Sequence, residues 1–399
     1  MLNTIIIGAG QAGLSLSYYL TQKGINHLIL EKGTVGEEWR SHRWDSFHLI
    51  TPNSFTRLPG FPYKGNNPDG FDTRDQMVKF FEDYSKSFNA PINENNLVTS
   101  VARNKEGFLV TTNKGKFRAI NVVVAVGAFH KPLIPKVSKI LPKDIIQIHS
   151  SEYKNSKQLP KGVVLVVGGG NSGIQIAVDL KNAGRKVYLS LGKLRIVSRR
   201  YRGKDFMEWA ELMGVLDRTT EETSEEIKNL NPPALFGKNE TVNLRRLAQN
   251  GIQLLGHLED FKKGIFIFAN NLPKNLEEGE VSLINFKNTV DKLIQEKGMK
   301  APKEKLEKAF KTNPKMIPKL GIKENNITSV IWATGFQDDY SFLRIPVFNK
   351  NGVPVHKKGV SKIPGLYFIG LRWLSKYKSF LLCGVGEDAK YLADRIAVR

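Results

Sequence analysis

Short runs of β-branched and other apolar residues, each followed by glycine, mark the start of regular structure in this chain. Residues 4–7 form such a run, and the glycine-rich stretch 8–13 follows it directly. Apolar residues then recur at helical spacing over 14–23, and a second apolar run covers 26–30. This succession predicts a βαβ unit, in which a helix joins two parallel strands.

The same succession occurs a second time near the middle of the chain. A strand pattern at 163–167 leads into the glycine-rich stretch 168–173, a helix pattern at 174–182 and a further strand pattern at 186–191. The internal repeat therefore predicts two nucleotide-binding α/β domains.

Three alternating segments lie between the two copies. Residues 97–102, 107–112 and 115–119 are bounded by Asn, Lys or Gly, which predicts an antiparallel meander. The meander leads into an all-apolar strand at 122–126 that ends at Gly127.

Regular patterns return near the C-terminal end of the sequence. Strands are predicted at 327–333 and 365–369, and a closing helix at 379–395. Within the preceding region, 285–294 and 303–310 are expected to be amphipathic surface helices.

The simplest organisation is one Rossmann-like domain interrupted by another. Residues 1–155 and 326–399 are expected to form the first domain, and residues 156–325 the inserted domain with its helical segments. The predicted fold class is thus α/β, with two dinucleotide-binding domains.

The composition is that of an ordinary globular protein. The chain has 399 residues, of which 41% are hydrophobic and 25% charged, so a sizeable core is expected. We find no leader peptide and no apolar run of about 20 residues, which predicts a cytoplasmic protein without a membrane span. Cys383 is the only cysteine, which excludes an intramolecular disulfide and a Cys-x-x-Cys redox pair.

The net charge of +22 has two interpretations. The lysines are scattered, with no compact basic run between aromatics, so no nucleic acid partner is expected. A lysine-rich composition without a partner explains the charge most simply, and weak association with an anionic membrane surface is the alternative. The sequence is compatible with a homodimer but does not decide the oligomeric state.

The first glycine-rich stretch has the features of a dinucleotide site. Gly8, Gly10 and Gly13 follow a strand and open a helix, where backbone N–H groups and the helix dipole can bind a pyrophosphate. Glu31, at the end of the second strand, is placed to accept hydrogen bonds from a ribose.

The second stretch keeps the glycines and loses the acid. Gly168, Gly170 and Gly173 repeat the fingerprint, but Leu191 stands where Glu31 stands in the first copy. Cationic side chains suit a 2′-phosphate better than a free hydroxyl, so the second nucleotide is predicted to be NADPH. The alternative is that some of these bases are solvated or pair with nearby acids. The bases that follow Leu191 are Lys193, Arg195, Arg199 and Arg200.

Several motifs outside the fingerprints are shared with a known family. The strands that end at Gly127 and Gly335, together with the aromatic segment 39–63, resemble the flavin-containing monooxygenases, the class B flavoprotein monooxygenases. Segment 44–62 is similar to plant indole-3-pyruvate monooxygenases, and a bacterial branch is more similar still. One departure is that Lys143 and Ile145 stand where the family signature has Phe and Gly. The motifs of the bacterial branch are His149-Ser150-Ser151-Glu152-Tyr153, Arg199-Arg200-Tyr201-Arg202-Gly203-Lys204-Asp205 and Gly384-Val385-Gly386-Glu387-Asp388.

This resemblance implies the cofactors and the reaction. The first fingerprint is expected to hold FAD and the second NADPH, and no metal is expected. The implied activity inserts one oxygen atom from O2 into a small organic substrate through a flavin C4a-(hydro)peroxide. N-oxygenation, S-oxygenation and oxidation at a carbonyl all remain open. The residues expected at the two cofactors are Gly8, Gly10, Gln11, Ala12, Gly13, Glu31, Lys32, Trp39, Arg40, Trp44, Val101, Ala125, Gly127, Gly168, Gly170, Asn171, Ser172, Gly173, Ser190, Arg195, Arg199, Arg200, Ala333, Gly335, Phe380, Leu381 and Leu382.

Some of these residues have two interpretations. Asn53 is the candidate for the catalytic residue that hydrogen-bonds the peroxide, or else a turn residue after Pro52. Trp39 and Trp44 are expected either against the flavin or in the core. Residues Phe206, Trp209, Leu212 and Met213 share one helical face, which is typical of core, with a substrate-pocket wall as the alternative.

Two other functions compete with the monooxygenase. An NADPH-dependent reductase or oxidase would keep both nucleotides and pass electrons to O2, a quinone or a protein partner. A flavin-binding interaction module, recruited by its positive charge, would need neither fingerprint intact.

Overall fold

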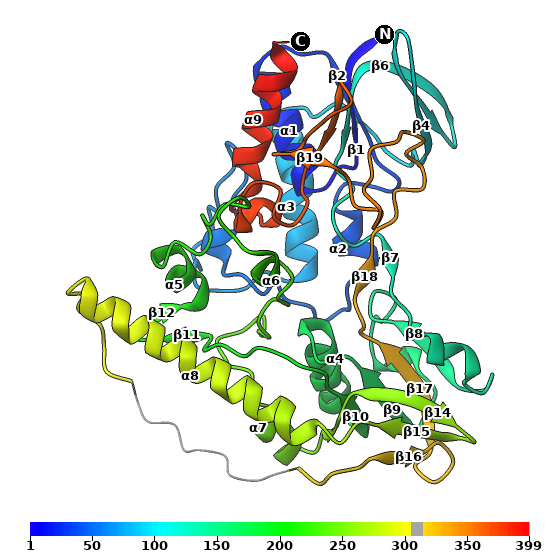
Figure 1. Cartoon of the computed structure of the whole chain (residues 1–399), viewed down its shortest axis with the longest axis vertical. Helices are drawn as coiled ribbons and strands as arrows, with labels where there is room; N and C mark the ends of the chain where they lie inside the picture. Colours follow the sequence, from blue (N-terminus) through cyan, green and yellow to red (C-terminus); the bar gives the residue numbers. More distant parts are fainter. Residues whose placement is uncertain (305–313, 399) are drawn as a thin grey trace.

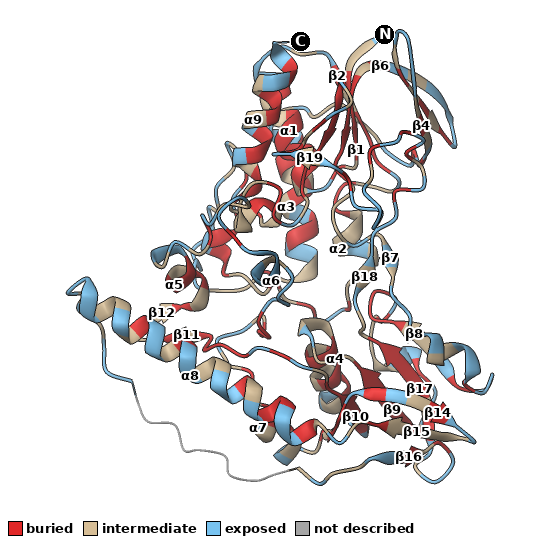
Figure 2. Cartoon of the chain, in the orientation of Figure 1, coloured by how far each residue is buried: buried red, intermediate tan, exposed pale blue. Residues whose placement is uncertain are grey.

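The chain folds into two α/β lobes, each built around a parallel sheet (Figure 1). The computed structural model describes residues 1–304 and 314–398. Both ends of the chain lie at the top of the first lobe (Figure 1). Buried residues are concentrated on the central strands and on the helix faces that cover them (Figure 2).

The first lobe is organised around β1 (Leu2–Ile7), whose inner residues are almost entirely buried. Since both faces of this strand are covered, its second half, residues 5–7, is continuously apolar rather than alternating. It pairs in parallel with β2 (His27–Leu30) and β6 (Gly115–Val124). The other strands of this sheet are β3 (Ile92–Asn93), β4 (Val98–Asn104), β5 (Gly107–Thr112), β19 (His356–Lys357), β20 (Val360–Ser361) and β21 (Leu366–Phe368).

The segments predicted as separate strands at 115–119 and 122–126 form one strand, β6. Its first half pairs antiparallel with β5 and its second half in parallel with β1. No turn residue separates the halves, and Asn121 between them is buried, with its amide nitrogen donating to the Asn3 carbonyl at 3.2 Å. The meander therefore continues directly into the central sheet.

The second lobe contains two strands that the predicted boundaries at 155 and 326 assigned to the first. The strand order is β13-β10-β9-β17-β8, so β8 (Ile146–His149) and β17 (Ile327–Trp332) belong to this sheet. The correction has a physical cause: β9 (Val163–Val167) is buried along its whole length and needs a partner on each edge. The remaining strands are β10 (Val187–Ser190) and β13 (Gln253–Leu255).

The lobes are joined where the chain crosses between them. Here β7 (Lys131–Pro132) and β18 (Phe336–Gln337) pair antiparallel. The sheet pairing therefore places the crossings at these strands. The smaller strands are β11 (Arg200–Tyr201), β12 (Lys204–Asp205), β14 (Leu258–Lys262), β15 (Ile265–Phe268) and β16 (Lys319–Gly321).

The closing helix α9 is shorter than the predicted 379–395. It covers Val385–Ala397, and the preceding residues form a 3-10 turn, η4 (Tyr377–Phe380), followed by extended backbone at Leu381. Glu387 and Asp388 lie in its first turn, where they offset the positive end of the helix dipole. The helix therefore begins six residues after the predicted start.

The other helices begin at recognisable signals. In α3 (Arg74–Ser87) Thr73 and Gln76 form a capping box, and α8 (Leu272–Glu296), which includes the predicted 285–294, has proline in its first turn. From residue 305 on, the helix predicted at 303–310 lies outside the described residues. The other helices are α1 (Gln11–Gln22), α2 (Glu37–Ser41), α4 (Asn171–Asn182), α5 (Phe206–Leu212), α6 (Glu225–Lys228) and α7 (Leu244–Gln249), with 3-10 turns η1 (Asn53–Phe55), η2 (Lys136–Ile140) and η3 (Ser156–Gln158).

A buried arginine links the second lobe to the loop before η1. The Arg199 side chain is 1% exposed, and its guanidinium forks onto both carboxylate oxygens of Asp205, with Nε at 2.8 Å. A third donor, Nη1, reaches the Ile50 carbonyl at 2.7 Å. Because all three contacts are shielded from water, the β11–β12 hairpin and the 50–53 segment are held together.

Replacing Arg199 by alanine should lower the free energy of unfolding by about 3–5 kcal/mol, because Asp205 would remain buried without its partner. The matched control is Arg200→Ala: this neighbour is one-third exposed and 3.6 Å from Asp69, so a change within about 0.5 kcal/mol is expected. Urea unfolding followed by tryptophan fluorescence measures both values. Equal losses for the two variants would show that the buried pair does not support the fold.

Candidate functional site

The first glycine-rich loop is shaped by close backbone contacts. Gly8 has φ +106°, and a Cβ there would lie 2.7 Å from the Ala125 carbonyl oxygen. A Cβ at Gly13 would overlap the Gly8 carbonyl. Only glycine fits these two positions, so the turn between β1 and α1 is as tight as the fingerprint predicts.

Gly10 differs from its neighbours in facing open space. A Cβ added there would have no protein atom within 4 Å. Gly10 is also the N-cap of α1, and the helix has neither a side-chain cap nor an acid in its first turn. Unpaired N–H groups and the positive end of the helix dipole thus face a vacant cradle, which fits a pyrophosphate.

Glu31 closes the loop at the end of β2. Its carboxylate accepts hydrogen bonds from the backbone N–H groups of Ala9 at 2.7 Å and Gly33 at 3.0 Å. Burial raises the pKa of this carboxyl, and the two backbone hydrogen bonds oppose that rise. A carboxylate has about four acceptor positions, so Glu31 retains capacity to bind ribose hydroxyls.

The second loop repeats this geometry. Gly168 has φ +123° and meets the Ala333 carbonyl, while a Cβ at Gly173 would overlap the Gly168 carbonyl. Gly170 again faces open space and is the uncapped N-terminus of α4. Leu191 is buried, so this cradle has no ribose acid at that position.

Polar residues around the second loop have protein partners of their own. The Asn171 side chain accepts a hydrogen bond from the Leu235 backbone N–H at 2.7 Å. Ser190 is buried and donates to the Gly256 carbonyl at 2.8 Å, and the Gly335 carbonyl contacts His149 Nε2 at 3.0 Å. Ser172 lies half-buried in the first turn of α4.

Two of the four bases predicted to bind a 2′-phosphate are directed elsewhere. The prediction for Arg199 is wrong, because its guanidinium is buried against Asp205 and the Ile50 carbonyl. Arg200 lies in β11, where it donates to the Gly203 carbonyl and faces Asp69. Lys193 and Arg195 remain exposed immediately after the cradle.

Gln11 connects the first loop to the 3-10 turn η4. As the first residue of α1, it donates from Nε2 to the Phe380 carbonyl at 2.5 Å. Ala12 is buried beside Gly370, and Leu382 lies in the first-lobe core. The Phe380 carbonyl thus lies beside the first loop, and Gly127 adds open backbone just beyond β6.

Other predicted cofactor contacts are used within the protein. Val101 is fully buried, and its N–H and carbonyl pair with Phe342 and Arg344, so this prediction is corrected. Trp44 belongs to the core of the second lobe, which favours the core interpretation. The exposed Lys32 and Arg40 pair with Glu38 and Glu82, respectively.

Trp39 belongs to an aromatic group that includes a cation. The indole stacks on Phe81 with ring centroids 6.2 Å apart, and the Arg43 guanidinium lies 5.4 Å from the Trp39 ring. Arg43 also lies 5.7 Å from Phe129, just beyond β6. Arg43 lies two residues beyond the end of α2, and no pattern in the sequence singled it out.

Asn53 is 3% exposed, at the start of η1. Its Nδ2 group donates to the Asn67 carbonyl at 3.0 Å and to the Tyr63 hydroxyl at 3.3 Å. Its Oδ1 has no partner among the described residues. A half-turn of the amide would bring two acceptors together at Asn67, so hydrogen bonding fixes this orientation. The unpaired group is therefore an acceptor, the Oδ1 atom.

An apolar cluster lies beside Asn53. Phe55 packs with Met207, Ala210 and Leu216, and the half-buried Leu381 adjoins them. Trp209 is fully buried, with its indole nitrogen donating to the Tyr201 carbonyl at 2.7 Å, so it belongs to the core. The proposed α5 face thus divides between the core and this cluster.

Asp205 is the main residue that the sequence analysis missed. It pairs with Arg199 and also caps α5 in a capping box with Glu208. The Asp-x-x-Glu spacing before an apolar helical run is a readable signal for such a cap. Among the described residues, no cluster of metal-ligating side chains is found. No helix in the described part of the chain combines the length and apolar character that crossing a bilayer requires.

The two kinds of glycine should respond differently to alanine. Gly10→Ala should fold normally and lose flavin, because its methyl group enters only the vacant cradle. Gly13→Ala should destabilise the fold, because its methyl group meets the Gly8 backbone. Thermal unfolding and the flavin content of purified protein measure the two effects. Normal flavin content in Gly10→Ala would mean that the phosphate lies elsewhere.

Comparison with known proteins agrees with this geometry. Residues 5–231 match the family model described as pyridine nucleotide-disulphide oxidoreductase. A CzcO-like oxidoreductase of Geobacillus kaustophilus is 36% identical, with 99% of this chain and 98% of the relative covered. The Arabidopsis thaliana protein named indole-3-pyruvate monooxygenase YUCCA6 is 30% identical over 45% of each chain.

Solved structures share the two-lobe fold at low sequence identity. A flavin-containing monooxygenase from Stenotrophomonas maltophilia has a TM-score of 0.67 at 19% identity, covering 100% of this chain and 98% of the other. The bacillithiol disulfide reductase of Staphylococcus aureus reaches 0.62 at 16% identity, covering 100% and 98%. OTEMO in complex with FAD and NADP reaches 0.59 at 16% identity, covering 100% and 85%. The chain therefore belongs to the pyridine nucleotide-disulphide oxidoreductase family, as an oxidoreductase that resembles the flavin-containing monooxygenases.

Proposed function

We propose that this protein is an FAD-dependent, NADPH-consuming monooxygenase that transfers one oxygen atom of O2 to a small organic substrate. The observation that carries the proposal is the pair of open glycine cradles at Gly10 and Gly170, which differ at one position. The first cradle has Glu31 at the ribose position, and the second has the buried Leu191. This asymmetry suits two different dinucleotides.

The first cradle is assigned to FAD and the second to NADPH. Gly10 and the N-terminus of α1 would hold the FAD pyrophosphate, with Glu31 on the ribose. Gly170 and α4 would hold the NADPH pyrophosphate. Lys193, exposed two residues after Leu191 and 3.8 Å from the Glu278 carboxylate, is assigned to the 2′-phosphate.

The chain's own residues position the reactants and limit access of water. Bound FAD would supply electron transfer from NADPH to dioxygen and activation of the oxygen. The Asn53 Oδ1 atom would accept a hydrogen bond from a proton-bearing group next to the flavin. Phe55, Met207 and Leu216 form the apolar wall that would shield this group from solvent.

An NADPH-dependent reductase or oxidase is the second candidate, because the fold is shared with a disulfide reductase. One observation weighs against disulfide chemistry. Cys383 is the only cysteine in the sequence, and burial raises the pKa of its thiol to about 11. The thiol thus stays protonated at neutral pH and is a weak nucleophile.

Oxygen labelling separates the monooxygenase from the oxidase. The holoenzyme is supplied with NADPH, ¹⁸O2 and a panel of amines, thioethers, ketones and 2-oxo acids. A monooxygenase should place one ¹⁸O atom in the product for each NADPH consumed. If one molecule of hydrogen peroxide forms for each NADPH consumed with every compound in the panel, the oxidase is favoured instead.

Coenzyme choice tests the assignment of the second cradle. Replacing Lys193 by alanine should raise the Michaelis constant for NADPH about tenfold, because a hydrogen bond to a charged group contributes roughly 1.5–3 kcal/mol. The constant for NADH should stay unchanged, since NADH lacks the 2′-phosphate. Arg200→Ala is the matched control, because that side chain faces Asp69. Equal effects on the two coenzymes would remove Lys193 from the phosphate site.

A further inference from the structure

The lobes also touch through an arm of the second lobe. Residues 206–235, here called the arm, run from α5 through α6. They lie against residues 375–381, here called the C-terminal segment, below α9 (Figure 1). Backbone hydrogen bonds join them: Tyr377 N–H donates to the Arg218 carbonyl at 3.0 Å, and Thr220 N–H to the Ser375 carbonyl at 2.9 Å. The arm therefore pairs with the segment like an added strand.

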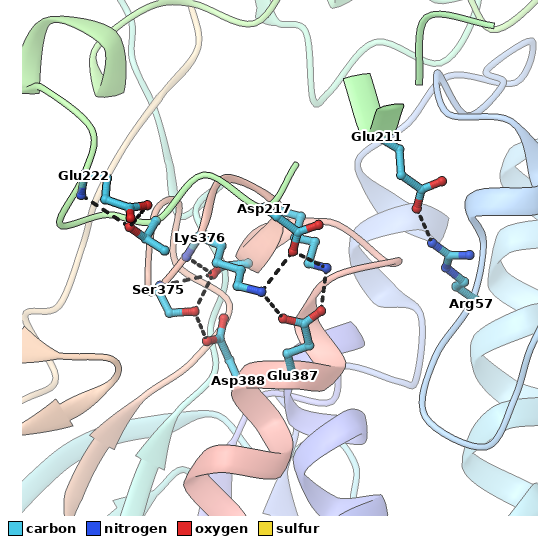
Figure 3. Close-up of polar contacts among 11 residues, drawn as sticks. Arg57, Glu211, Asp217, Glu222, Ser375, Lys376, Glu387 and Asp388 are labelled. Atoms are coloured by element: carbon cyan, nitrogen blue, oxygen red, sulfur yellow. Dashed lines mark hydrogen bonds and ion pairs between the residues drawn. The ribbon is translucent and has the colours of Figure 1, made fainter. Parts of the chain in front are cut away.

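Four charged side chains reinforce this pairing. Asp217 of the arm accepts from both Lys376 and Lys378 at 2.9 Å, and the same two lysines reach Glu387 in the first turn of α9. Figure 3 shows the Lys376 ammonium between the Asp217 and Glu387 carboxylates. We call Asp217, Lys376, Lys378 and Glu387 the interlobe ion cluster. In it, one arm carboxylate pairs with two lysines at the start of η4.

The C-terminal segment leads directly to the first cradle. Lys378 is part of η4, which ends at Phe380, and the Phe380 carbonyl accepts from Gln11 at 2.5 Å. Gln11 is the first residue of α1, next to Gly10. A displacement of η4 would therefore also shift the phosphate-binding turn.

The other end of the arm reaches the second cradle. Leu235 N–H donates to the Asn171 side chain at 2.7 Å, and the Leu235 carbonyl accepts from Gln175 at 3.1 Å. Asn171 is the first residue of α4, as Gln11 is of α1. A continuous series of bonded residues thus joins the first helical residues of the two fingerprints.

We propose that Asp217 is a positioning residue for electron transfer between the two nucleotides. Through Lys376 and Lys378 it fixes η4 on the arm and so sets the first cradle relative to the second. This inference rests on the proposed function, because NADPH bound at the second cradle must deliver a hydride to the flavin bound at the first. Hydride transfer depends steeply on alignment, and a misplacement of about 1 Å can cost roughly a hundredfold in rate.

The electrostatics of the cluster predict a salt dependence. The Asp217 side chain is 52% exposed and that of Glu387 50%, so dissolved ions can screen them. Hydrogen bonds from Lys378 and Lys376 hold the pKa of Asp217 below its usual value, so the carboxylate is ionised at neutral pH. Above that pKa, salt rather than pH should weaken the contact.

The experiment measures flavin reduction by saturating NADPH in the anaerobic holoenzyme. Asp217→Asn should lower the rate constant roughly tenfold and abolish its decrease between about 0.05 and 0.5 M salt. Its flavin content and melting temperature should stay near wild type, and Asp217→Glu should restore most of the rate. Glu225→Gln is the matched control: this acid lies on the same arm, is 80% exposed and pairs with Lys228.

A second readout keeps the inference testable apart from activity. Hydrogen exchange of the backbone amides at 375–381 should speed up in Asp217→Asn and not in Glu225→Gln. A wild-type reduction rate in Asp217→Asn, or equal slowing in both variants, would overturn the inference while leaving the proposed function intact. Failure of the wild-type flavin to accept electrons from NADPH would overturn the proposed function. In that case, unchanged hydrogen exchange at 375–381 in Asp217→Asn would show that the interlobe ion cluster does not restrain η4 either.

Discussion

The contact between a loop glycine and the end of a neighbouring strand is the constraint on which both sites depend. Gly8 lies against Ala125 and Gly168 against Ala333, closer than any side chain would permit. Each phosphate-binding turn is thereby tied to the strand end just before a crossing between the lobes, at β7 or β18. The cradles and the connection between the lobes consequently form one structural unit.

The sequence predicts the local elements of this unit well. Apolar runs, glycine spacing and helix periodicity locate β1, α1, β9 and α4 within a few residues, because these features are set by neighbouring residues. Strand partners are different. Whether 327–332 joins the first or the second sheet depends on which edge of β9 is uncovered, and no local pattern records that. The boundaries between the lobes were misplaced for this reason.

The direction of charged side chains was the other part that the sequence could not supply. Arg199 and Lys193 are both cations within eight positions of Leu191, yet one is fully buried and the other is 79% exposed. The hairpin β11–β12 decides this outcome, since it turns the chain back and brings Asp205 beside Arg199. Distance along the sequence indicates which bases follow Leu191, while only the fold determines which of them remain exposed.

The orientation of the Asn53 amide has a consequence for selectivity. Its two N–H groups are engaged by Asn67 and Tyr63, so the buried amide has a free lone pair on Oδ1 and no free proton. A neutral hydroxyl or amine can satisfy that lone pair, whereas a deprotonated oxygen would be repelled by it. On the proposed function, a group that reaches this asparagine would bind well only if it carries its own hydrogen.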